Sequence, residues 1–335
     1  MKAWTLTRYG GPDASAMREV KRPAPGPSEV LVRVKAAGLN PVDFKIRNGD
    51  LKPVLRFDLP VTMGNELAGI VEECGTAVSR FARGDRVFAR TGKMAMGAFA
   101  EYAAVHQDYL AKIPGTLDFR QAAAIPLAGL TALQALRDEL KIGPGSRVFI
   151  SAGAGGVGTF AVRIAKWLGA QVATTASPRG HDLVKDLGAD TVIDYTSDDF
   201  EDVLSDMDGA FDLIGGETLS RTFGIVKKGG RVVSIAGTPE PRTARQDIGA
   251  GKGMAALFWV ASAKLRWQAW RHGVDYRFLL MHPSGAELHE LALLAADGTL
   301  EPVIDRTFPF DEIADAMAYL EKGHAKGKVV VEMTD

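Results

Sequence analysis

Apolar and polar residues alternate in the first third of the chain and recur at helical spacing further on. Residues 29–35 (EVLVRVK) alternate strictly, as a strand with one buried face does. Short apolar runs at 67–71, 86–89 and 98–105 predict further strands, with Gly and Pro between them. The pattern predicts a compact β domain of barrel type from residue 1 to about residue 120.

From residue 147 onward, short apolar strands alternate with amphipathic helices. Strands are predicted at 147–152, 171–176, 191–194, 211–214 and 231–236, and helices at 182–187 and 218–228. Alternation of this kind is typical of a parallel, doubly wound sheet with crossover helices. Later, Ser284 and Glu287 have the spacing of a helix capping box, and a final strand is predicted at 328–332. The chain is therefore expected to be an α/β protein.

A glycine-rich loop follows the first strand of this second region. Gly153, Gly155 and Gly158 form a G-x-G-x-x-G pattern, and the next helix has an apolar face running from Phe160 to Trp167. Such glycines permit a tight turn, a close approach of backbone N–H groups to a pyrophosphate, and close packing of helix on strand. The positive end of the helix then favours phosphate. The predicted cofactor-binding residues of this loop are Gly153, Ala154, Gly155, Gly156, Val157 and Gly158.

The end of the second strand of this region indicates which dinucleotide is bound. Folds that bind NAD usually carry an acidic residue there, about twenty residues past the glycines, to hold the ribose 2′-hydroxyl. Here the strand is followed by Ser177 and Arg179, and no acid is present. A hydroxyl and a guanidinium suit a 2′-phosphate, so the sequence predicts NADPH in preference to NADH. Tyr195, just after the third strand, could cover the phosphate or the adenine, or could simply be a packing residue.

The composition of the chain mainly argues against certain partners, locations and cysteine-based sites. The chain has 335 residues, 46% of them hydrophobic, and a formal net charge of −1, which gives no reason to expect a nucleic-acid or membrane partner. Its first residues lack the hydrophobic region of a signal peptide, so a cytoplasmic location is expected. Cys74 is the only cysteine, which rules out an intrachain disulfide and a cysteine-rich zinc lobe.

One segment, residues 242–271, does not fit the strand-helix pattern. It is rich in Arg and Lys, has the single acid Asp247, and carries Trp259, Trp267 and Trp270. A segment of this type can cap a pocket, meet a dimer partner, touch an anionic membrane or bind nucleic acid. A pocket wall or a dimer contact is expected here; no membrane partner is expected and nucleic acid is not favoured.

The motifs together resemble the zinc-independent quinone oxidoreductase and enone reductase branch of the medium-chain dehydrogenase/reductases, over essentially the whole chain. The residues that carry the resemblance are 37–45 (AGLNPVDFK), 64–69 (GNELAG), 81–87 (FARGDRV), the glycine loop, 187–190 (LGAD), 212–217 (DLIGGE) and 327–330 (GKVV). The resemblance implies two domains. Residues 1–122, completed by 285–335, would form a GroES-like catalytic domain, and residues 123–284 a Rossmann domain that binds NADP, with the active site between them. It also implies a homodimer.

The resemblance bears on metal as well. Zinc-using relatives place a cysteine where Asn40 stands and a histidine where Asn65 stands, and asparagine is a poor zinc ligand. Glu66 remains, but one carboxylate does not make a zinc site, and the six histidines show no ligand spacing. No metal is therefore expected.

Without zinc to stabilise an alkoxide, reduction of a quinone or of the C=C bond of an α,β-unsaturated carbonyl is the expected reaction. The resemblance places Asn40, Lys45 and Asn65 in the catalytic site, with Lys45 as a cation beside a developing enolate or as an ordinary solvated lysine. The two asparagines could hydrogen-bond the substrate or the nicotinamide ribose, or could simply satisfy neighbouring backbone groups. It places the nicotinamide near Thr131, Ala236 and Gly237. The alternatives are an NADPH-binding protein with little turnover, structural or nucleic-acid-binding, and a reductase of enoyl thioesters.

Overall fold

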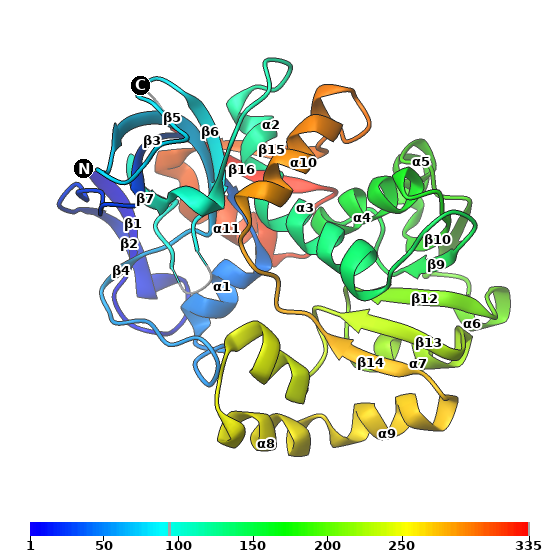
Figure 1. Cartoon of the computed structure of the whole chain (residues 1–335). Helices are drawn as coiled ribbons and strands as arrows, with labels where there is room; N and C mark the ends of the chain where they lie inside the picture. Colours follow the sequence, from blue (N-terminus) through cyan, green and yellow to red (C-terminus); the bar gives the residue numbers. More distant parts are fainter. Residues whose placement is uncertain (93–94, 334–335) are drawn as a thin grey trace. The chain divides into compact units, whose positions relative to one another are not determined.

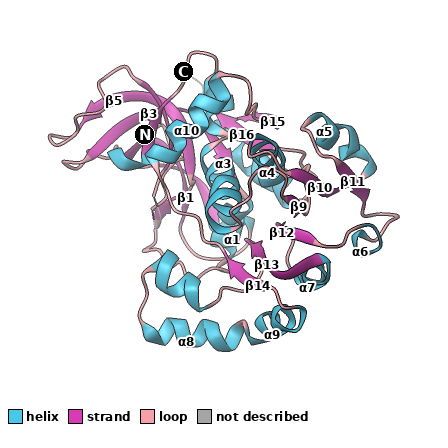
Figure 2. Ribbon diagram, turned by 45° about the vertical axis from the view of Figure 1, so that its right-hand side comes forward, coloured by secondary structure: helices cyan, strands magenta, loops and turns pink. Residues whose placement is uncertain are grey.

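A computed structural model describes residues 1–92 and 95–333 of the chain (Figure 1). The chain divides into two compact units, the first made of residues 1–130 and 283–335, the second of residues 131–282. Strands predominate in the first unit, whereas helices and strands alternate along the second unit (Figure 2).

The first unit is built mainly of strands. Its strands are β1 (Lys2–Leu6), β2 (Ser15–Glu19), β3 (Glu29–Leu39), β4 (Val61–Thr62), β5 (Glu66–Cys74), β6 (Arg86–Arg90), β7 (Tyr102–His106), β8 (Leu110–Lys112), β15 (Ile304–Pro309) and β16 (Lys328–Glu332). Its helices are α1 (Pro41–Asn48), α2 (Phe119–Ala123), α10 (Gly285–Ala296) and α11 (Ile313–Glu321), with short 3₁₀ turns at Pro12–Ala14, Gln107–Tyr109 and Phe310–Glu312. Helix α3 (Pro126–Leu133) contains the boundary between the units.

A seven-stranded sheet organises this unit. Its strands run in the order β15-β16-β3-β5-β6-β8, with β7 also paired to β3, and a smaller sheet has the order β2-β1-β4. Strand β16 pairs antiparallel with β3, so the last residues of the chain complete a sheet begun by the first forty. The strict alternation of residues 29–35 becomes the first part of β3, in which Val30, Val32 and Val34 are buried.

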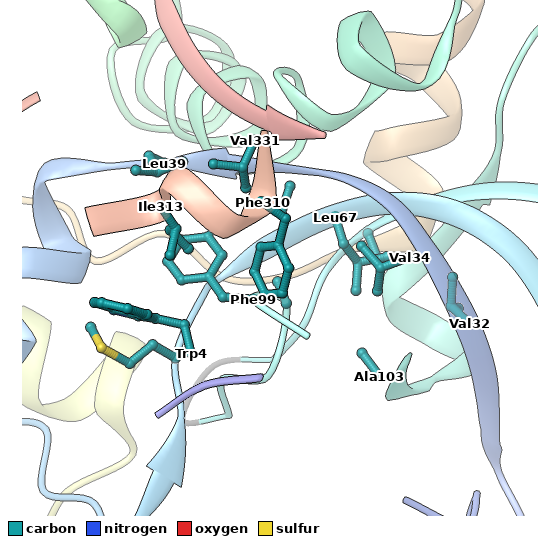
Figure 3. Packing of buried hydrophobic residues seen from close by; sticks show 14 of the residues in the cluster. Trp4, Val32, Val34, Leu39, Leu67, Phe99, Ala103, Phe310, Ile313 and Val331 are labelled. Carbon is teal, nitrogen blue, oxygen red and sulfur yellow. The ribbon is translucent and has the colours of Figure 1, made fainter. Parts of the chain in front are cut away.

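The core of the first unit gathers residues from both ends of the chain. Trp4, Phe99, Ile313 and Val331 lie in one buried cluster, with the rings of Trp4, Phe99 and Phe310 close together (Figure 3). Each large apolar side chain that is withdrawn from water stabilises the fold by about 1.5–3 kcal/mol. The C-terminal segment is thus part of the hydrophobic core and not an appendage.

The second unit is an open, parallel sheet with helices. Its strands are β9 (Arg147–Ile150), β10 (Gln171–Ala176), β11 (Thr191–Asp194), β12 (Met207–Asp212), β13 (Val226–Ser234) and β14 (Asp275–Phe278). Its helices are α4 (Gly156–Trp167), α5 (His181–Asp186), α6 (Phe200–Val203), α7 (Gly216–Ile225), α8 (Lys252–Ala261) and α9 (Ala263–His272), with π-helical turns η3 (Gln134–Glu139) and η5 (Thr243–Ile248) and a 3₁₀ turn η4 (Pro178–Gly180).

The strand order in this sheet is β11-β10-β9-β12-β13-β14, and every pairing is parallel. The direction in which the chain winds therefore reverses between β9 and β12. Ligands of open α/β sheets bind at such a switch point, outside the carboxyl ends of the strands. The carboxyl ends of β9 and β12 are consequently where a cofactor site is to be looked for.

Candidate functional site

The glycine loop between β9 and α4 is shaped by contacts within the protein. A Cβ atom on Gly153 would lie 2.2 Å from the Thr174 hydroxyl, and one on Gly158 would lie 2.2 Å from the backbone oxygen of Ala152. The Thr174 hydroxyl donates to the Ile150 carbonyl at 2.6 Å, which fixes its position. Two of the three motif glycines are therefore needed for close packing of the loop on strand β10 and on its own first turn.

Gly155 differs from the other two glycines. It is the N-cap of α4, with φ −79°, and a Cβ there would meet only the Ala152 oxygen, at 3.3 Å. The backbone conformation does not require glycine at this position, and a methyl group would need only a small shift of the Ala152 oxygen. The absent side chain leaves room directly in front of the amino end of a twelve-residue helix, where N–H groups favour an anion. This open cradle fits the pyrophosphate of a dinucleotide.

A buried polar network joins the carboxyl ends of the three central strands. The Asp212 carboxylate, at the end of β12, accepts from the Ser234 hydroxyl at 2.6 Å and from the backbone N–H of Gly215 at 3.0 Å. The Ser151 hydroxyl, just after β9, accepts from the N–H of Leu213 at 2.8 Å. Burial raises the pKa of the Asp212 carboxyl. The network ties the three strand ends together at the switch point and gives the loops beyond them fixed positions.

The loop after β13 is held by the same network. The N–H groups of Ala236 and Gly237 both donate to the Ser234 hydroxyl, at 3.1 and 2.8 Å. A Cβ on Gly237 would lie 2.4 Å from the hydroxyl of Tyr276, which in turn donates to the Thr238 carbonyl. The structure therefore places Ala236 and Gly237 at the carboxyl edge of the sheet, as expected for residues that hold a nicotinamide.

The turn after β10 lies beside the glycine loop. A Cβ on Gly180 would lie 2.9 Å from the Cβ of Ala154, so turn η4, which carries Arg179, packs against the loop. Arg179 is exposed and Ser177 is half-buried. Tyr195, after β11, is 61% exposed. These side chains come just after the carboxyl ends of β10 and β11, and an adenosine ribose lies beyond the second strand in folds of this kind.

The first unit holds a separate buried cluster of charged and amide groups centred on Glu66. One carboxylate oxygen of Glu66 accepts from the Lys328 ammonium at 2.6 Å and from the Asn40 amide at 2.7 Å. The other oxygen accepts from the N–H of Leu127 at 2.6 Å. The Lys328 ammonium also donates to the Asn40 amide oxygen at 2.5 Å. Since a Cβ on Gly38 would lie 2.4 Å from the Glu66 carboxylate, the glycine of the AGLN motif makes room for this group.

Asp43 and Asn65 extend the cluster. The Asp43 carboxylate accepts from the Asn65 amide at 2.6 Å and from the backbone N–H of Asn40 at 2.7 Å. Complete burial raises the pKa of Asp43 to about 7, against these hydrogen bonds, which lower it. Desolvation likewise lowers the pKa of the buried Arg90 to about 10. The buried region therefore holds Asp43 and Arg90 beside the ion pair of Glu66 and Lys328.

Replacing Asp43 with asparagine is expected to remove a pH dependence of stability. The unfolded chain ionises this carboxyl near the ordinary pKa of 3.8, whereas the folded protein keeps the proton up to about pH 7. Between those values only the unfolded state gains from ionisation, so the contribution of Asp43 to stability falls as the pH rises and is level above pH 7.

The unfolding free energy is measured by urea denaturation. The value for Asp43→Asn minus that for the parent should therefore rise by a few kcal/mol as the pH goes from about 4 to about 7. The exposed Asp50→Asn serves as the control and should show a constant difference. A constant difference for Asp43→Asn as well would show that this carboxyl ionises normally in the folded protein.

The remaining residues expected in the site have different environments. Lys45 lies on α1 with an exposed side chain, and among the described residues its ammonium forms no ion pair. Thr131 is buried on α3. Asn40 and Asn65 come together through Asp43 and the Glu66 group, and both are almost fully buried. Asn40 uses both atoms of its amide on protein partners.

No group of three or more His, Cys, Asp or Glu side chains is arranged to hold a metal ion within residues 1–92 and 95–333. The same residues include no helix that is long and apolar enough to cross a bilayer.

Two features of these sites were missed from the sequence. The roles of Ser151, Asp212 and Ser234 depend on which strand ends are neighbours, and that follows only from the sheet order. The pairing of Lys328 with Glu66 joins residues 262 positions apart. The available signal was a lysine followed directly by three valines in strand β16, because a charge in a buried strand needs a partner.

Comparison with known proteins agrees with this architecture. Residues 26–115 match the family model described as alcohol dehydrogenase GroES-like domain, and residues 187–331 match the one described as zinc-binding dehydrogenase. The chain is 36% identical over 343 residues to the NADPH-dependent alkenal/one oxidoreductase, chloroplastic, of Arabidopsis thaliana, covering 99% of this chain and 79% of that protein.

Solved structures give the same result. The quinone oxidoreductase from Coxiella burnetii is 32% identical with a TM-score of 0.86, covering 100% of this chain and 99% of that one. The Escherichia coli quinone oxidoreductase complexed with NADPH is 26% identical with a TM-score of 0.83, covering 99% and 100% of the two chains. With its GroES-like and Rossmann-type parts, the chain belongs to the medium-chain dehydrogenase/reductases, in the branch of the quinone oxidoreductases and enone reductases.

Proposed function

We propose that this protein is an NADPH-dependent reductase that acts without zinc on quinones or on the C=C bond of α,β-unsaturated carbonyls. The observation that carries the proposal is the glycine loop at the switch point of the parallel sheet, with an open cradle at Gly155 and a basic turn beside it. The relatives named as quinone and alkenal/one oxidoreductases support the same reaction class.

The end of strand β10 supports NADPH as the cofactor. Ser177 and Arg179 stand where an acid would repel a 2′-phosphate, and the packing of Gly180 on Ala154 keeps this turn next to the glycine loop. One relative is named as NADPH-dependent and another was solved with NADPH. The residues present therefore fit the phosphorylated cofactor.

Reversing the charge of Arg179 should weaken NADPH binding selectively. A charge-assisted hydrogen bond is worth roughly 1.5–3 kcal/mol, so Arg179→Glu is expected to raise the Kd for NADPH by about 10- to 100-fold. The Kd for NADH should change little. Fluorescence titration with both cofactors measures this, and Lys185→Glu, on the exposed face of the next helix, is the matched control. If Arg179→Glu weakened the binding of NADPH and NADH equally, Arg179 would not bind the 2′-phosphate.

The buried cluster of the first unit supports a reaction without zinc. Asparagines stand at both positions where zinc-using relatives have ligands, and the Glu66 carboxylate is already neutralised by the Lys328 ammonium. A fixed ammonium beside the remaining carboxylate opposes the entry of a second cation. We therefore infer that the active protein carries no stoichiometric zinc, which elemental analysis of freshly purified, active protein would test.

NADPH held at the glycine loop would supply a hydride for the β-carbon of an enone or for a quinone. The protein then has to stabilise the negative charge that develops on the substrate oxygen, and water or a side chain supplies a proton.

We propose Lys45 for the stabilising charge because its ammonium is exposed. Asn65 is proposed to contact the substrate or the nicotinamide ribose through its amide oxygen, because its hydrogen bond to Asp43 is made by the amide nitrogen. Asn40 is proposed as a positioning residue, held by Glu66 and Lys328. Thr131, Ala236 and Gly237 are proposed to contact the nicotinamide.

A substrate panel separates this function from its alternatives. NADPH absorbance is followed with 9,10-phenanthrenequinone, a small enone and crotonyl-CoA. Turnover of the quinone or the enone supports the proposal. Preference for crotonyl-CoA would favour an enoyl-thioester reductase, and no oxidation with any of the three would favour a protein that binds NADPH with little turnover. A homodimer remains a prediction, to be checked by light scattering.

A further inference from the structure

Helices α8 and α9 follow one another with only Ser262 between them, and together they have two contrasting faces. Figures 1 and 2 show them end to end, as a pair extending past the edge of the parallel sheet. The inward face is buried or half-buried and repeats every three or four residues: Ala255, Phe258, Ser262, Leu265 and Ala269. Helix α9 packs on α7 and β14, and helix α8 packs on the π-helical turn η5, so both helices rest on the second unit.

The outward face is also rich in large apolar side chains. Among the described residues, ten large hydrophobic side chains are exposed, and five of them lie on these two helices: Leu257, Trp259, Val260, Trp267 and Trp270. Trp270 is 75% exposed and Val260 66%. We call this the α8–α9 surface. When the free face of a helix is apolar as well as its packed face, the free face indicates a surface that binds a partner.

The charge on the α8–α9 surface is of one sign. Residues 252–272 contain Lys252, Lys264, Arg266 and Arg271 and no acidic residue, which is a net charge of +4 with histidine neutral. The whole chain has a net charge of −1, so the other residues sum to −5. The guanidinium of Arg266 lies 5.0 Å from the ring centre of Trp259, and that of Arg271 lies 4.9 Å from that of Trp267. Cations and aromatic rings therefore share one surface.

We propose that the α8–α9 surface docks on an anionic lipid bilayer. Tryptophan rings suit the boundary between headgroups and acyl chains, the aliphatic side chains of Leu257 and Val260 suit the outer acyl region, and lysine and arginine suit lipid phosphates. The surface thus complements a negatively charged apolar boundary in both charge and polarity. This inference goes beyond the reductase function and does not depend on it.

Two other occupants fit less well. In a two-fold dimer made through this surface, the same patch would face itself and would bring four cations against four cations. Single-stranded nucleic acid could stack on the tryptophans and pair with the cations, but it offers nothing to the exposed Leu257 and Val260. A bilayer uses all three kinds of side chain, and the proposal commits to it.

Vesicle flotation with the full chain tests the proposal. The protein is expected to float with vesicles of equal parts phosphatidylcholine and phosphatidylglycerol, to stay behind with pure phosphatidylcholine, and to be released by high salt. Tryptophan fluorescence should shift to the blue on binding.

Two variants make the test specific. Lys264→Glu/Arg271→Glu and Trp267→Ser/Trp270→Ser should each lower the vesicle partition coefficient by at least about tenfold. The matched controls are Lys185→Glu on α5 and Trp167→Ser on α4, a tryptophan that is 40% exposed elsewhere on the same unit, and both should bind like the parent. Far-UV circular dichroism and NADPH affinity equal to the parent's show that each variant is folded.

Equal flotation with neutral and anionic vesicles would overturn the proposal, as would variants that float like the parent. Tighter binding to a fluorescent oligonucleotide than to the anionic vesicles would assign the surface to nucleic acid instead. Loss of a dimer in the variants, without loss of flotation, would assign it to a second copy of the chain.

Discussion

Lys328→Met should lower the free energy of unfolding by about 3–5 kcal/mol, because it leaves the Glu66 carboxylate buried without its cation. Lys328 is 2% exposed and Glu66 is fully buried, so water cannot replace the lost partner. Methionine has nearly the same length and fills the same space. The loss therefore reports the uncompensated charge and not a cavity. Urea denaturation at neutral pH measures it.

The double variant Lys328→Met/Glu66→Gln separates the charge effect from other causes. Glutamine keeps one acceptor for the Leu127 or Asn40 donor and removes the charge, so most of the lost stability should return. Lys322→Met, an exposed lysine near the same end of the chain, is the control and should change stability by less than about 0.5 kcal/mol. A double variant as unstable as Lys328→Met would mean that the two groups do not compensate one another.

Gly155→Ala should lower NADPH affinity by about 100-fold, equivalent to about 2.7 kcal/mol, with little change in stability. The added methyl group needs only a small shift of the Ala152 oxygen, which would be 3.3 Å away, but it occupies the space where a pyrophosphate would approach the helix N-terminus. Isothermal titration with NADPH, together with urea denaturation, measures both quantities.

Gly158→Ala is the matched comparison for this prediction. Its Cβ would lie 2.2 Å from the Ala152 oxygen and 2.8 Å from the Gly153 backbone, so the loop itself must open. This variant should lose stability, by about 1–3 kcal/mol, as well as affinity. If Gly155→Ala bound NADPH like the parent, the cradle in front of α4 would not be the pyrophosphate site.

Local sequence patterns were sufficient to predict several elements in both units. Strands β10, β11 and β16 have the predicted bounds, and Ser284 caps α10 by accepting from the N–H of Glu287. The strand, glycine loop and helix stand in the predicted order around Gly155. These features depend on residues close in sequence, which is why they could be predicted.

Other boundaries were wrong for identifiable reasons. A helix was predicted over residues 218–228, but α7 ends at Ile225 and Val226 already begins β13. Strand pairing decided this, since Val226 pairs with Met207 of β12. Trp167, expected on the apolar face of α4, is 40% exposed at the end of that helix. Helical spacing alone does not show how far the neighbouring sheet extends.

Long-range contacts account for what the sequence did not predict. The asparagines and Glu66 were recognised by motif, but the ammonium that neutralises Glu66 comes from the last strand, and the proton held by Asp43 is a consequence of complete burial. The exposure of the tryptophans on α8 and α9 likewise depends on which helix faces pack inward. Both features are properties of the packed chain.

Isotope transfer tests whether the protein passes a hydride from NADPH to the substrate without zinc. The protein is incubated with a small enone and NADPH carrying deuterium at C4, on one face of the ring in one reaction and on the other face in a second. We expect one of the two cofactors to deliver deuterium to the β-carbon of the saturated product, with no zinc added. Product without deuterium from either cofactor, or no product until zinc is supplied, would contradict it.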